Sequence, residues 1–346
     1  MTKRIALLAG VWLMSIISYV AGVYVLCGIV EHYPAIAPFV FVDTHGSTAF
    51  SLKGALIQPT AFLAVILFSL AVEAFCLGFE DSAIKRLLDG RSPSAKVDVF
   101  YVTLKLFGGI NVMAMMFSFG TLFWAVNKIH GYVDCDVLQY VHSNILQFLI
   151  VYLINTLVAY WHHRIMHTKW MWEIHKVHHA AEEMNVVTPL RNHPIDHIIG
   201  SLMNAVPVAL LGARPGVVIV YYAINMVYQS LVHSEIVLKG KWWDWVWITP
   251  AAHRMHHSDR PEHFDRNFGI VTFWDKVFGT YLTPTDEKLH YGVYNGELFN
   301  SPNRLREIFA NVRRWLSAGS EPAEPTIVHP AAMSAKPPEQ PLRKSA

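Results

Sequence analysis

The sequence is poor in charge and in cysteine, and each shortage narrows the class of protein. Of its 346 residues, 16% are charged and 53% are hydrophobic, whereas soluble domains carry about 25% charged residues. The net charge of +2 gives no reason to expect nucleic acid as a partner. The three cysteines show no CxxC spacing, so they indicate neither a disulfide framework nor a thiolate zinc site. The composition therefore points to a membrane protein.

Two catalytic fingerprints are also missing. No HExxH motif occurs, so the pattern of a zinc protease, whose glutamate acts as general base between two metal ligands, is lacking. No glycine fingerprint for a flavin or nicotinamide cofactor occurs either. Any electrons that the protein uses must therefore come from an external donor.

Long uncharged or apolar runs are present, and they predict membrane-spanning helices, because a span needs about 20 apolar residues. Two shorter runs follow, separated by GARPG, and they predict a helical hairpin that either spans the membrane or re-enters it. The predicted spans are residues 5–30, 55–78, 106–126 and 145–161, and the hairpin covers residues 198–211 and 217–231.

Basic residues predict the orientation in the membrane, because cytoplasmic loops are enriched in lysine and arginine. The loops assigned to the cytosol contain Lys3, Arg4, Lys85, Arg86, Arg91, Lys96, Arg164, Lys169, Lys176 and Arg191, and the opposite loops contain Lys53 and Lys128. Both termini and all histidine clusters are therefore expected in the cytosol. A bacterial inner membrane is favoured over the endoplasmic reticulum.

The predicted fold class is an all-α integral membrane protein. It has about four transmembrane helices, a helical hairpin and a cytosolic, histidine-rich helical cap that holds a dimetal site. Its predicted parts are an N-terminal transmembrane region (1–143), a histidine-rich catalytic region (144–285), a C-terminal cytosolic segment (286–320) and a disordered tail rich in proline and alanine (321–346).

Histidine is the residue type that the chain concentrates. Residues 161–179 read WHHRIMHTKWMWEIHKVHH and hold six of the chain's 19 histidines. The spacing is HxxxH at 163–167 and HxxHH at 175–179, and HxxHH recurs at 253–257. A helix places each set on one face. Because a neutral imidazole is a common metal ligand, we interpret the three sets as one metal site at the ends of membrane helices.

Two further histidines join this hypothesis. His193 lies in RNHP, and His233 lies in LVHSE at the cytosolic end of the predicted hairpin. One structural zinc needs four ligands, so ten candidates fit two neighbouring ions with four or five imidazoles each. His162 is off the face of His163 and is predicted not to bind, whereas His197 stays an open eleventh candidate. The predicted metal ligands are His163, His167, His175, His178, His179, His193, His233, His253, His256 and His257.

The residues alone do not choose the metal, because imidazole suits zinc, copper, iron and nickel. A nearby carboxylate is a candidate for orienting a ligand ring, which is a common arrangement around metal-bound histidine. The candidates for this role are Glu173, Glu182, Glu183, Asp196 and Glu235, and the sequence does not choose among them.

The segments HRIMH (163–167), HKVHH (175–179) and HRMHH (253–257) resemble the three histidine boxes of the fatty acid hydroxylase / sterol desaturase superfamily of integral membrane proteins. The resemblance covers residues 160–281. It extends to HP at 193–194, HSE at 233–235, NFG at 267–269 and WDKVFGTY at 274–281. We interpret the last two segments as structural supports for the third box.

This resemblance implies a non-haem di-iron oxygenase that hydroxylates or desaturates a lipid C–H bond, of a sterol-like or fatty acyl substrate. It implies two iron ions as cofactor, which zinc can replace in purified or overexpressed protein, and no catalytic residue beyond the metal ligands. It also implies O2, a lipid from the bilayer and an electron donor such as cytochrome b5 or ferredoxin as partners. The alternative is a membrane metal-binding or transport protein, or a zinc hydrolase, without oxygenase activity.

Overall fold

The computed structural model describes residues 52–90, 92–106, 109, 137–238, 242–285 and 287–318. The α-helices are α3 (Leu52–Leu77), α4 (Ala83–Asp89), α5 (Pro93–Leu106), α8 (Asn144–Met166), α9 (Trp172–His179), α10 (Pro194–Leu210), α11 (Pro215–Val232), α12 (Trp243–Val246), α13 (Pro250–His256), α14 (Thr272–Val277), α15 (Gly296–Phe299) and α16 (Arg304–Ala318). Short 3₁₀ helices are η2 (Val137–Tyr140), η3 (Thr188–Leu190) and η4 (Pro261–His263). In this described part, β-structure is confined to two isolated bridges, Trp247–Val271 and Ser258–Tyr291.

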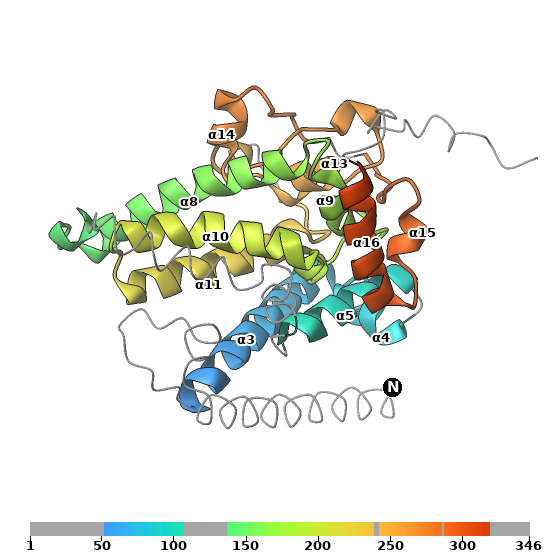
Figure 1. Ribbon diagram of the computed structural model, residues 1–346, viewed down its shortest axis with the longest axis horizontal. Coiled ribbons are helices and arrows are strands. Elements are labelled where there is room, and N and C mark those ends of the chain that lie inside the picture. Colours follow the sequence, from blue (N-terminus) through green and yellow to red (C-terminus); the bar gives the residue numbers. More distant parts are fainter. Residues whose placement is uncertain are drawn as a thin grey trace, which may run out of the picture.

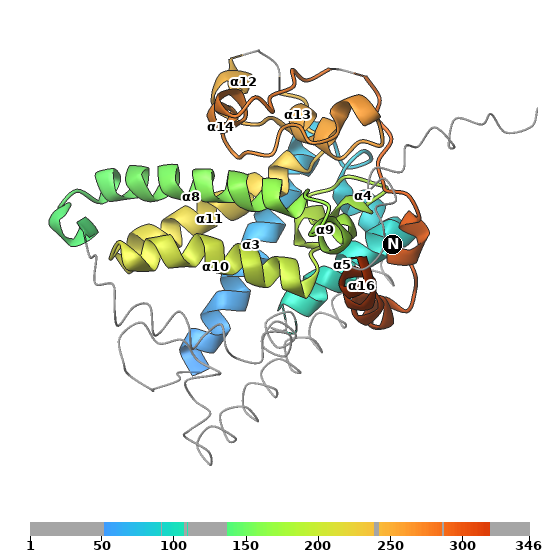
Figure 2. The same cartoon turned by 45° about the horizontal axis from the view of Figure 1, so that its top comes forward.

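Three long helices form the body of the described structure. α8, α10 and α11 run lengthwise together, and α3 crosses them at an angle and packs on α11 (Figure 1). The short helix α9 packs on α16 at the end where α8 stops. α13 lies at the same end of α8, but Figure 2 shows it above α8, with α9 and α16 below. The helical character agrees with the prediction.

One described helix, α8, is long and apolar enough to cross a membrane, and residues 62–77 and 216–232 form shorter apolar helices. The expected span at 55–78 corresponds to α3, and the expected span at 145–161 corresponds to α8. The expected spans at 5–30 and 106–126 lie almost wholly outside the described residues. Four transmembrane helices therefore stay a prediction.

Ser143 caps the start of α8, because its side chain accepts a hydrogen bond from the Leu146 N–H at 3.3 Å. Ile145, Leu149 and Leu153 are exposed along it, as expected for side chains that face lipid. The helix continues to Met166, past the predicted end at residue 161, so the first histidine box starts on its last turn.

α10 and α11 form the predicted hairpin, and its turn lies beside the start of α8. The Leu138 N–H donates to the Leu211 carbonyl at 2.9 Å, and the Arg214 N–H donates to the Gln147 side-chain oxygen at 3.1 Å. Gly212 has φ of 67°, a left-handed conformation that glycine adopts without strain. The hairpin therefore extends along the whole length of α8.

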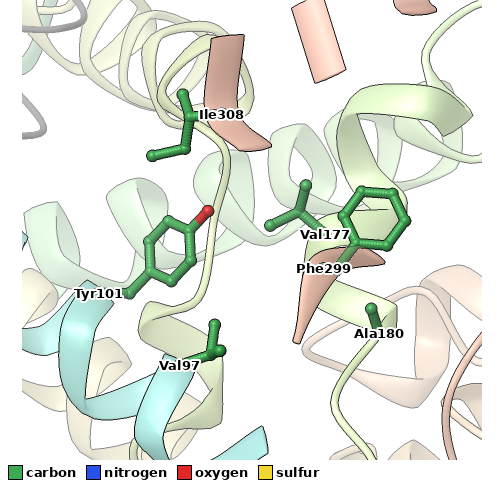
Figure 3. Close-up of a cluster of buried hydrophobic side chains, with 6 residues drawn as sticks. All are labelled: Val97, Tyr101, Val177, Ala180, Phe299 and Ile308. Atoms are coloured by element: carbon green, nitrogen blue, oxygen red, sulfur yellow. The ribbon is translucent and has the colours of Figure 1, made fainter. Parts of the chain in front are cut away.

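A buried apolar cluster joins α5, α9, α15 and α16 at the opposite end of α8. Its members, drawn in Figure 3, are Val97, Tyr101, Val177, Ala180, Phe299 and Ile308. Burying a valine or phenylalanine side chain stabilises a fold by about 1.5–3 kcal/mol. This cluster therefore holds α9, which carries the second histidine box, against three helices that come before and after it in the chain.

A buried arginine adds polar contacts beside this cluster. Arg191 is fully buried, and its Nε donates to the Val177 carbonyl at 2.8 Å. A second guanidinium nitrogen lies 3.6 Å from a carboxylate oxygen of Asp98 on α5. The segment after the second box is thereby tied to α5 and α9, which fixes the path of the chain from α9 to α10.

Candidate metal centre

Four segments bring nine histidines together at the end of α8. They are the last turn of α8, helix α9, helix α13 and the residue that caps α11. The ligand atoms within each of three groups all lie within 4.8 Å of one another. The first group is His163, His167, His175 and His179, the second group is His178, His233, His253 and His257, and a linking group is His179, His256 and His257.

Short capped helices present the second and third boxes. Thr249 caps the start of α13: its side chain accepts from the Ala252 N–H at 3.4 Å, and Pro250 occupies the first helical position. α9 buries the face that carries its three histidines, as the i, i+3, i+4 spacing predicts. The local sequence therefore decides which face of each helix is rich in imidazole.

The Nε2 atoms face one another across the cluster. Their separations are 2.9 Å for His163–His256, 2.9 Å for His233–His253, 3.1 Å for His253–His257, 3.1 Å for His167–His179 and 3.3 Å for His178–His233. Two imidazoles that bind one ion at about 2.1 Å, with bond angles of about 90–110°, have nitrogens about 3.0–3.4 Å apart. The spacing is that of ligands which share an ion.

Hydrogen bonds on the other side of three rings decide which nitrogen faces the cluster. The contacts are His163 Nδ1 to the Phe268 carbonyl at 2.9 Å, His256 Nδ1 to the Arg266 carbonyl at 2.6 Å and His233 Nδ1 to the Gln229 carbonyl at 2.7 Å. A carbonyl oxygen only accepts, so Nδ1–H donates and Nε2 carries the lone pair. His163 and His256 therefore point two lone pairs at each other, which is repulsive unless a cation lies between them.

A metal ion fits that role better than a proton. Burial lowers the pKa of His256 to about 3 and that of His233 to about 4. Burial, followed by repulsion from neighbouring imidazoles, lowers the pKa of His178 and His179 well below the usual value. These rings are neutral at pH 7, which is the form that binds metals. His175 Nε2 adds a buried donor atom without a hydrogen-bond partner among the described residues.

A single carboxylate contacts two histidines beside the first group. Asp196, buried in the first turn of α10, accepts from His175 Nδ1 at 2.8 Å and lies 3.1 Å from His162 Nε2. α10 comes this close because residue 200 is glycine, where a Cβ would lie 2.9 Å from the His162 ring. Of the five carboxylates that the sequence offered, Asp196 is the one with such a contact in the described structure.

The turn before α14 supplies two of the carbonyl groups that orient histidines. Arg266 and Phe268 flank Asn267, whose φ of 55° is a left-handed conformation that asparagine tolerates. The Asp275 carboxylate accepts from the N–H groups of Phe268 at 2.8 Å and Gly269 at 2.7 Å. NFG and WDKVFGTY thus meet as a structural support, but the sequence carries no signal that their carbonyl groups select histidine tautomers.

Two histidines lie apart from the three groups. His193 Nε2 lies 3.2 Å from the Ile308 carbonyl, and His193 Nδ1 accepts from the Ile195 N–H at 3.1 Å. Both of its nitrogens are used by backbone groups, so nine of the ten predicted ligands come together and His193 does not join them. His197 lies on α10 and is in none of the groups found among the described residues. His193 was suggested as a ligand by its position in the RNHP motif alone. A motif position does not show which way a ring points.

This part of the chain is similar to known proteins. Residues 148–280 match the family model for fatty acid hydroxylase. Alkylglycerol monooxygenase from Xenopus tropicalis is 36% identical over 136 residues, which are 39% of this chain and 30% of that protein. Ornithine lipid hydroxylase OlsE from Rhizobium tropici is 29% identical over 127 residues, which are 36% of this chain and 38% of that protein.

A third relative has a different named substrate. Sphingolipid C4-hydroxylase sur2 from Schizosaccharomyces pombe is 26% identical over 145 residues, which are 40% of this chain and 49% of that protein. The chain thus spans between about a third and a half of the length of these curated relatives. No solved structure matches.

The fold and the cluster define a helical protein in which nine imidazoles, spaced as metal ligands are, lie at the end of a helix apolar enough to cross a membrane. The matched region, with its three histidine boxes in order, belongs to the fatty acid hydroxylase / sterol desaturase superfamily.

Proposed function

We propose that the protein is a membrane-bound, oxygen-dependent lipid hydroxylase with two iron ions. The observation that carries this proposal is the cluster of nine imidazoles, seven of them buried and two half-buried, in a chain region related to lipid hydroxylases. Imidazole ligands suit iron, although zinc binds the same atoms and is expected in overexpressed protein. The three named relatives are a monooxygenase and two hydroxylases, so hydroxylation is favoured over desaturation.

Each ion would be held by one of the two four-histidine groups. The first group would hold one ion together with His256, whose Nε2 lies 2.9 Å from that of His163, and the second group would hold the other ion. When bound, the two irons supply the redox chemistry that activates O2 toward a C–H bond without an acidic proton. The chain's own backbone carbonyl groups fix the tautomers of His163, His233 and His256, and burial limits the access of water to the cluster.

The balanced reaction needs an external reductant. One oxygen atom of O2 enters the C–H bond and the other leaves as water, while a donor provides two electrons and solvent provides two protons. An electron carrier such as cytochrome b5 or ferredoxin would fill this role. The donor would reach the centre from the cytosol, where we place the histidines and both termini, in a bacterial inner membrane rather than the endoplasmic reticulum.

The position of the cluster favours a lipid with a polar headgroup. The histidines follow the apolar part of α8 instead of interrupting it, so the reactive centre would lie at one surface of the bilayer. A lipid that enters from that leaflet presents the carbons near its headgroup to the metals. The relatives are named for alkylglycerol, ornithine lipid and sphingolipid, all of which carry a polar group.

The test is metal content followed by oxygen incorporation. Detergent-purified full-length protein, reconstituted with Fe2+ under reducing conditions, should contain about two irons per chain by mass spectrometry. With headgroup-bearing lipids, an electron donor and isotopically labelled O2, it should form labelled hydroxylated lipid. The His256→Ala variant should lose iron and product.

His290→Ala is the matched control, because His290 is exposed and lies outside the three groups. It should keep both iron and product. Two bound ions without O2 consumption across the lipid panel would contradict the hydroxylase proposal, and protein that holds no metal after reconstitution would contradict the metal centre itself.

A further inference from the structure

The two four-histidine groups differ in what lies behind their rings. In the first group, His163 Nδ1 contacts the Phe268 carbonyl, while His175 Nδ1 contacts Asp196 at 2.8 Å. His167 Nδ1 lies 3.2 Å from the exposed Asp265. Three of these four rings therefore have an oxygen acceptor on the side away from the cluster.

In the second group, fewer rings have a hydrogen-bond acceptor on the side away from the cluster. His233 Nδ1 contacts a backbone carbonyl at 2.7 Å. In contrast, Nδ1 of His178 and Nδ1 of His257 are buried and have no hydrogen-bond partner among the described residues. Both carboxylates that contact ring nitrogens of the nine histidines, Asp196 and Asp265, contact histidines of the first group.

Such partners change metal affinity in a known direction. An acceptor on Nδ1 holds the ring in its binding orientation, fixes Nε2 as the lone-pair nitrogen and makes it more basic. Loss of one such partner typically costs about 10–100-fold in metal affinity. A carboxylate also places negative charge near the bound cation, whereas a backbone carbonyl carries only a partial charge.

We infer that the two metal positions bind with unequal affinity, that the first group fills first, and that Asp196 is the positioning residue behind the difference. This inference rests on the proposed two-metal centre and concerns its assembly. Asp196 acts through His175 and also contacts His162 on α8, so one buried side chain joins α8 and the second box to α10. Asp265 is exposed, and solvent weakens its contribution.

The experiment titrates metal-free, full-length protein in detergent with Co2+, whose visible absorption reports nitrogen coordination, while mass spectrometry counts bound ions. The wild type should show two steps with affinities about 10–100-fold apart. Asp196→Asn keeps the shape and one carbonyl oxygen but removes the charge. It should weaken the first step by about 10-fold and leave the second step and the Co2+ spectrum of the second site unchanged.

Two variants make the outcome specific. His178→Ala should remove the second step and keep the first. Asp244→Asn alters a carboxylate that accepts from Thr249 at the start of α13 but contacts no ring of the cluster, so it should leave the ratio of the two affinities unchanged. If Asp196→Asn acted only by loosening the fold, it would weaken both steps and lower the unfolding temperature.

Two equal steps in the wild type, or equal weakening of both steps by Asp196→Asn, would overturn the inference. Neither result would affect the proposed hydroxylase activity, which is measured by labelled product. Conversely, two unequal steps in a protein that never hydroxylates lipid would overturn the proposed function and leave the inference in place.

Discussion

At the residue scale, the centre depends on atoms that lie outside the histidine boxes. His163 and His256 present lone pairs to each other because two carbonyl groups, of Phe268 and Arg266, hold the opposite ring nitrogens. Those carbonyl groups belong to one turn, and Asp275 holds that turn through two backbone N–H groups. The chemistry of the imidazoles therefore depends on the backbone geometry of a segment without a histidine.

Substitution of Gly269 tests whether metal binding depends on the turn formed by residues 266–268. A Cβ on Gly269 would lie 2.6 Å from an Asp275 carboxylate oxygen and 2.8 Å from the Val271 carbonyl, and the second neighbour is backbone that moves little. Gly269→Ala should therefore displace Asp275 from the turn, destabilise the protein by about 1–3 kcal/mol and reduce bound iron. Thermal unfolding and metal analysis measure both effects.

Gly216→Ala is the matched control, because no atom lies within 4 Å of a Cβ at that position on α11. Alanine is favoured over glycine inside a helix by up to about 1 kcal/mol. This variant should keep its metal and unfold at the same temperature or higher. Equal metal content in the two variants would refute the role assigned to the 266–268 turn.

At the scale of elements, α16 braces the second histidine box. Asn311 donates to the Glu173 carbonyl at 2.6 Å, and the Trp315 indole donates to the Trp170 carbonyl at 2.8 Å. His193 adds a third contact through the Ile308 carbonyl at 3.2 Å. The helix that follows the family-matched region thus contributes to the position of α9 and its three histidines.

The contact of His193 with the Ile308 carbonyl predicts that the stability of the packing against α16 depends on pH. Burial lowers the pKa of His193 to about 4, below the value of about 6.5 expected in the unfolded chain. Above pH 6.5, His193 is neutral in both states and does not lower the free energy of unfolding. As the pH falls from 6.5 toward 4, the unfolded chain takes up a proton first, and the free energy of unfolding falls by up to about 1.4 kcal/mol per pH unit. Protonated Nδ1 would also face the Ile195 N–H that it now accepts.

The His193→Asn variant isolates this effect, because the asparagine oxygen can accept from the Ile195 N–H without titrating. Unfolding free energies measured between pH 7 and pH 4 should fall less steeply in the variant, by about one proton. Its stability at pH 7 should drop by about 1 kcal/mol through loss of the bond to Ile308. An unchanged pH slope would show that His193 is not the titrating group.

At the scale of the whole molecule, the position of the α10–α11 hairpin bears on whether the hairpin spans the membrane or re-enters it. The hairpin turn contacts the start of α8 through Leu211 and Arg214, whereas the histidines lie at the end of α8. If α8 crosses the membrane, the hairpin must reach the same opposite face. We therefore expect a spanning hairpin instead of a re-entrant one, with its turn on the side away from the metals.

Single cysteines introduced into a cysteine-free variant would show on which side of the membrane the hairpin turn lies. Ala213→Cys in the hairpin turn should react with a membrane-impermeant thiol reagent from the side opposite to Ser317→Cys, which lies in α16 beside the centre. In intact bacterial cells, residue 213 should be labelled and residue 317 protected. Labelling of both from one side would contradict the spanning hairpin and favour a re-entrant one.

The sequence by itself determined the helical class, α8, the hairpin and eight of the nine histidines that meet, because these follow from local periodicity. His233 was predicted from its motif at the end of the hairpin. Apolar runs and i, i+3, i+4 spacing report which face of a helix is used, and they need no knowledge of its neighbours. The local sequence also suggested His193 as a metal ligand. That histidine does not join the cluster, because a motif position does not determine the direction in which a side chain points.

Only the tertiary structure decided which atoms support the centre. Asp196 meets His175, the Phe268 carbonyl meets His163 and the Ile308 carbonyl meets His193 across contacts that are distant in the chain. A carboxylate or a carbonyl group has no periodicity that marks it as a partner, and every residue has a carbonyl group. The choice among them comes from how helices pack, at positions such as Gly200 on α10, which lies against His162 of α8.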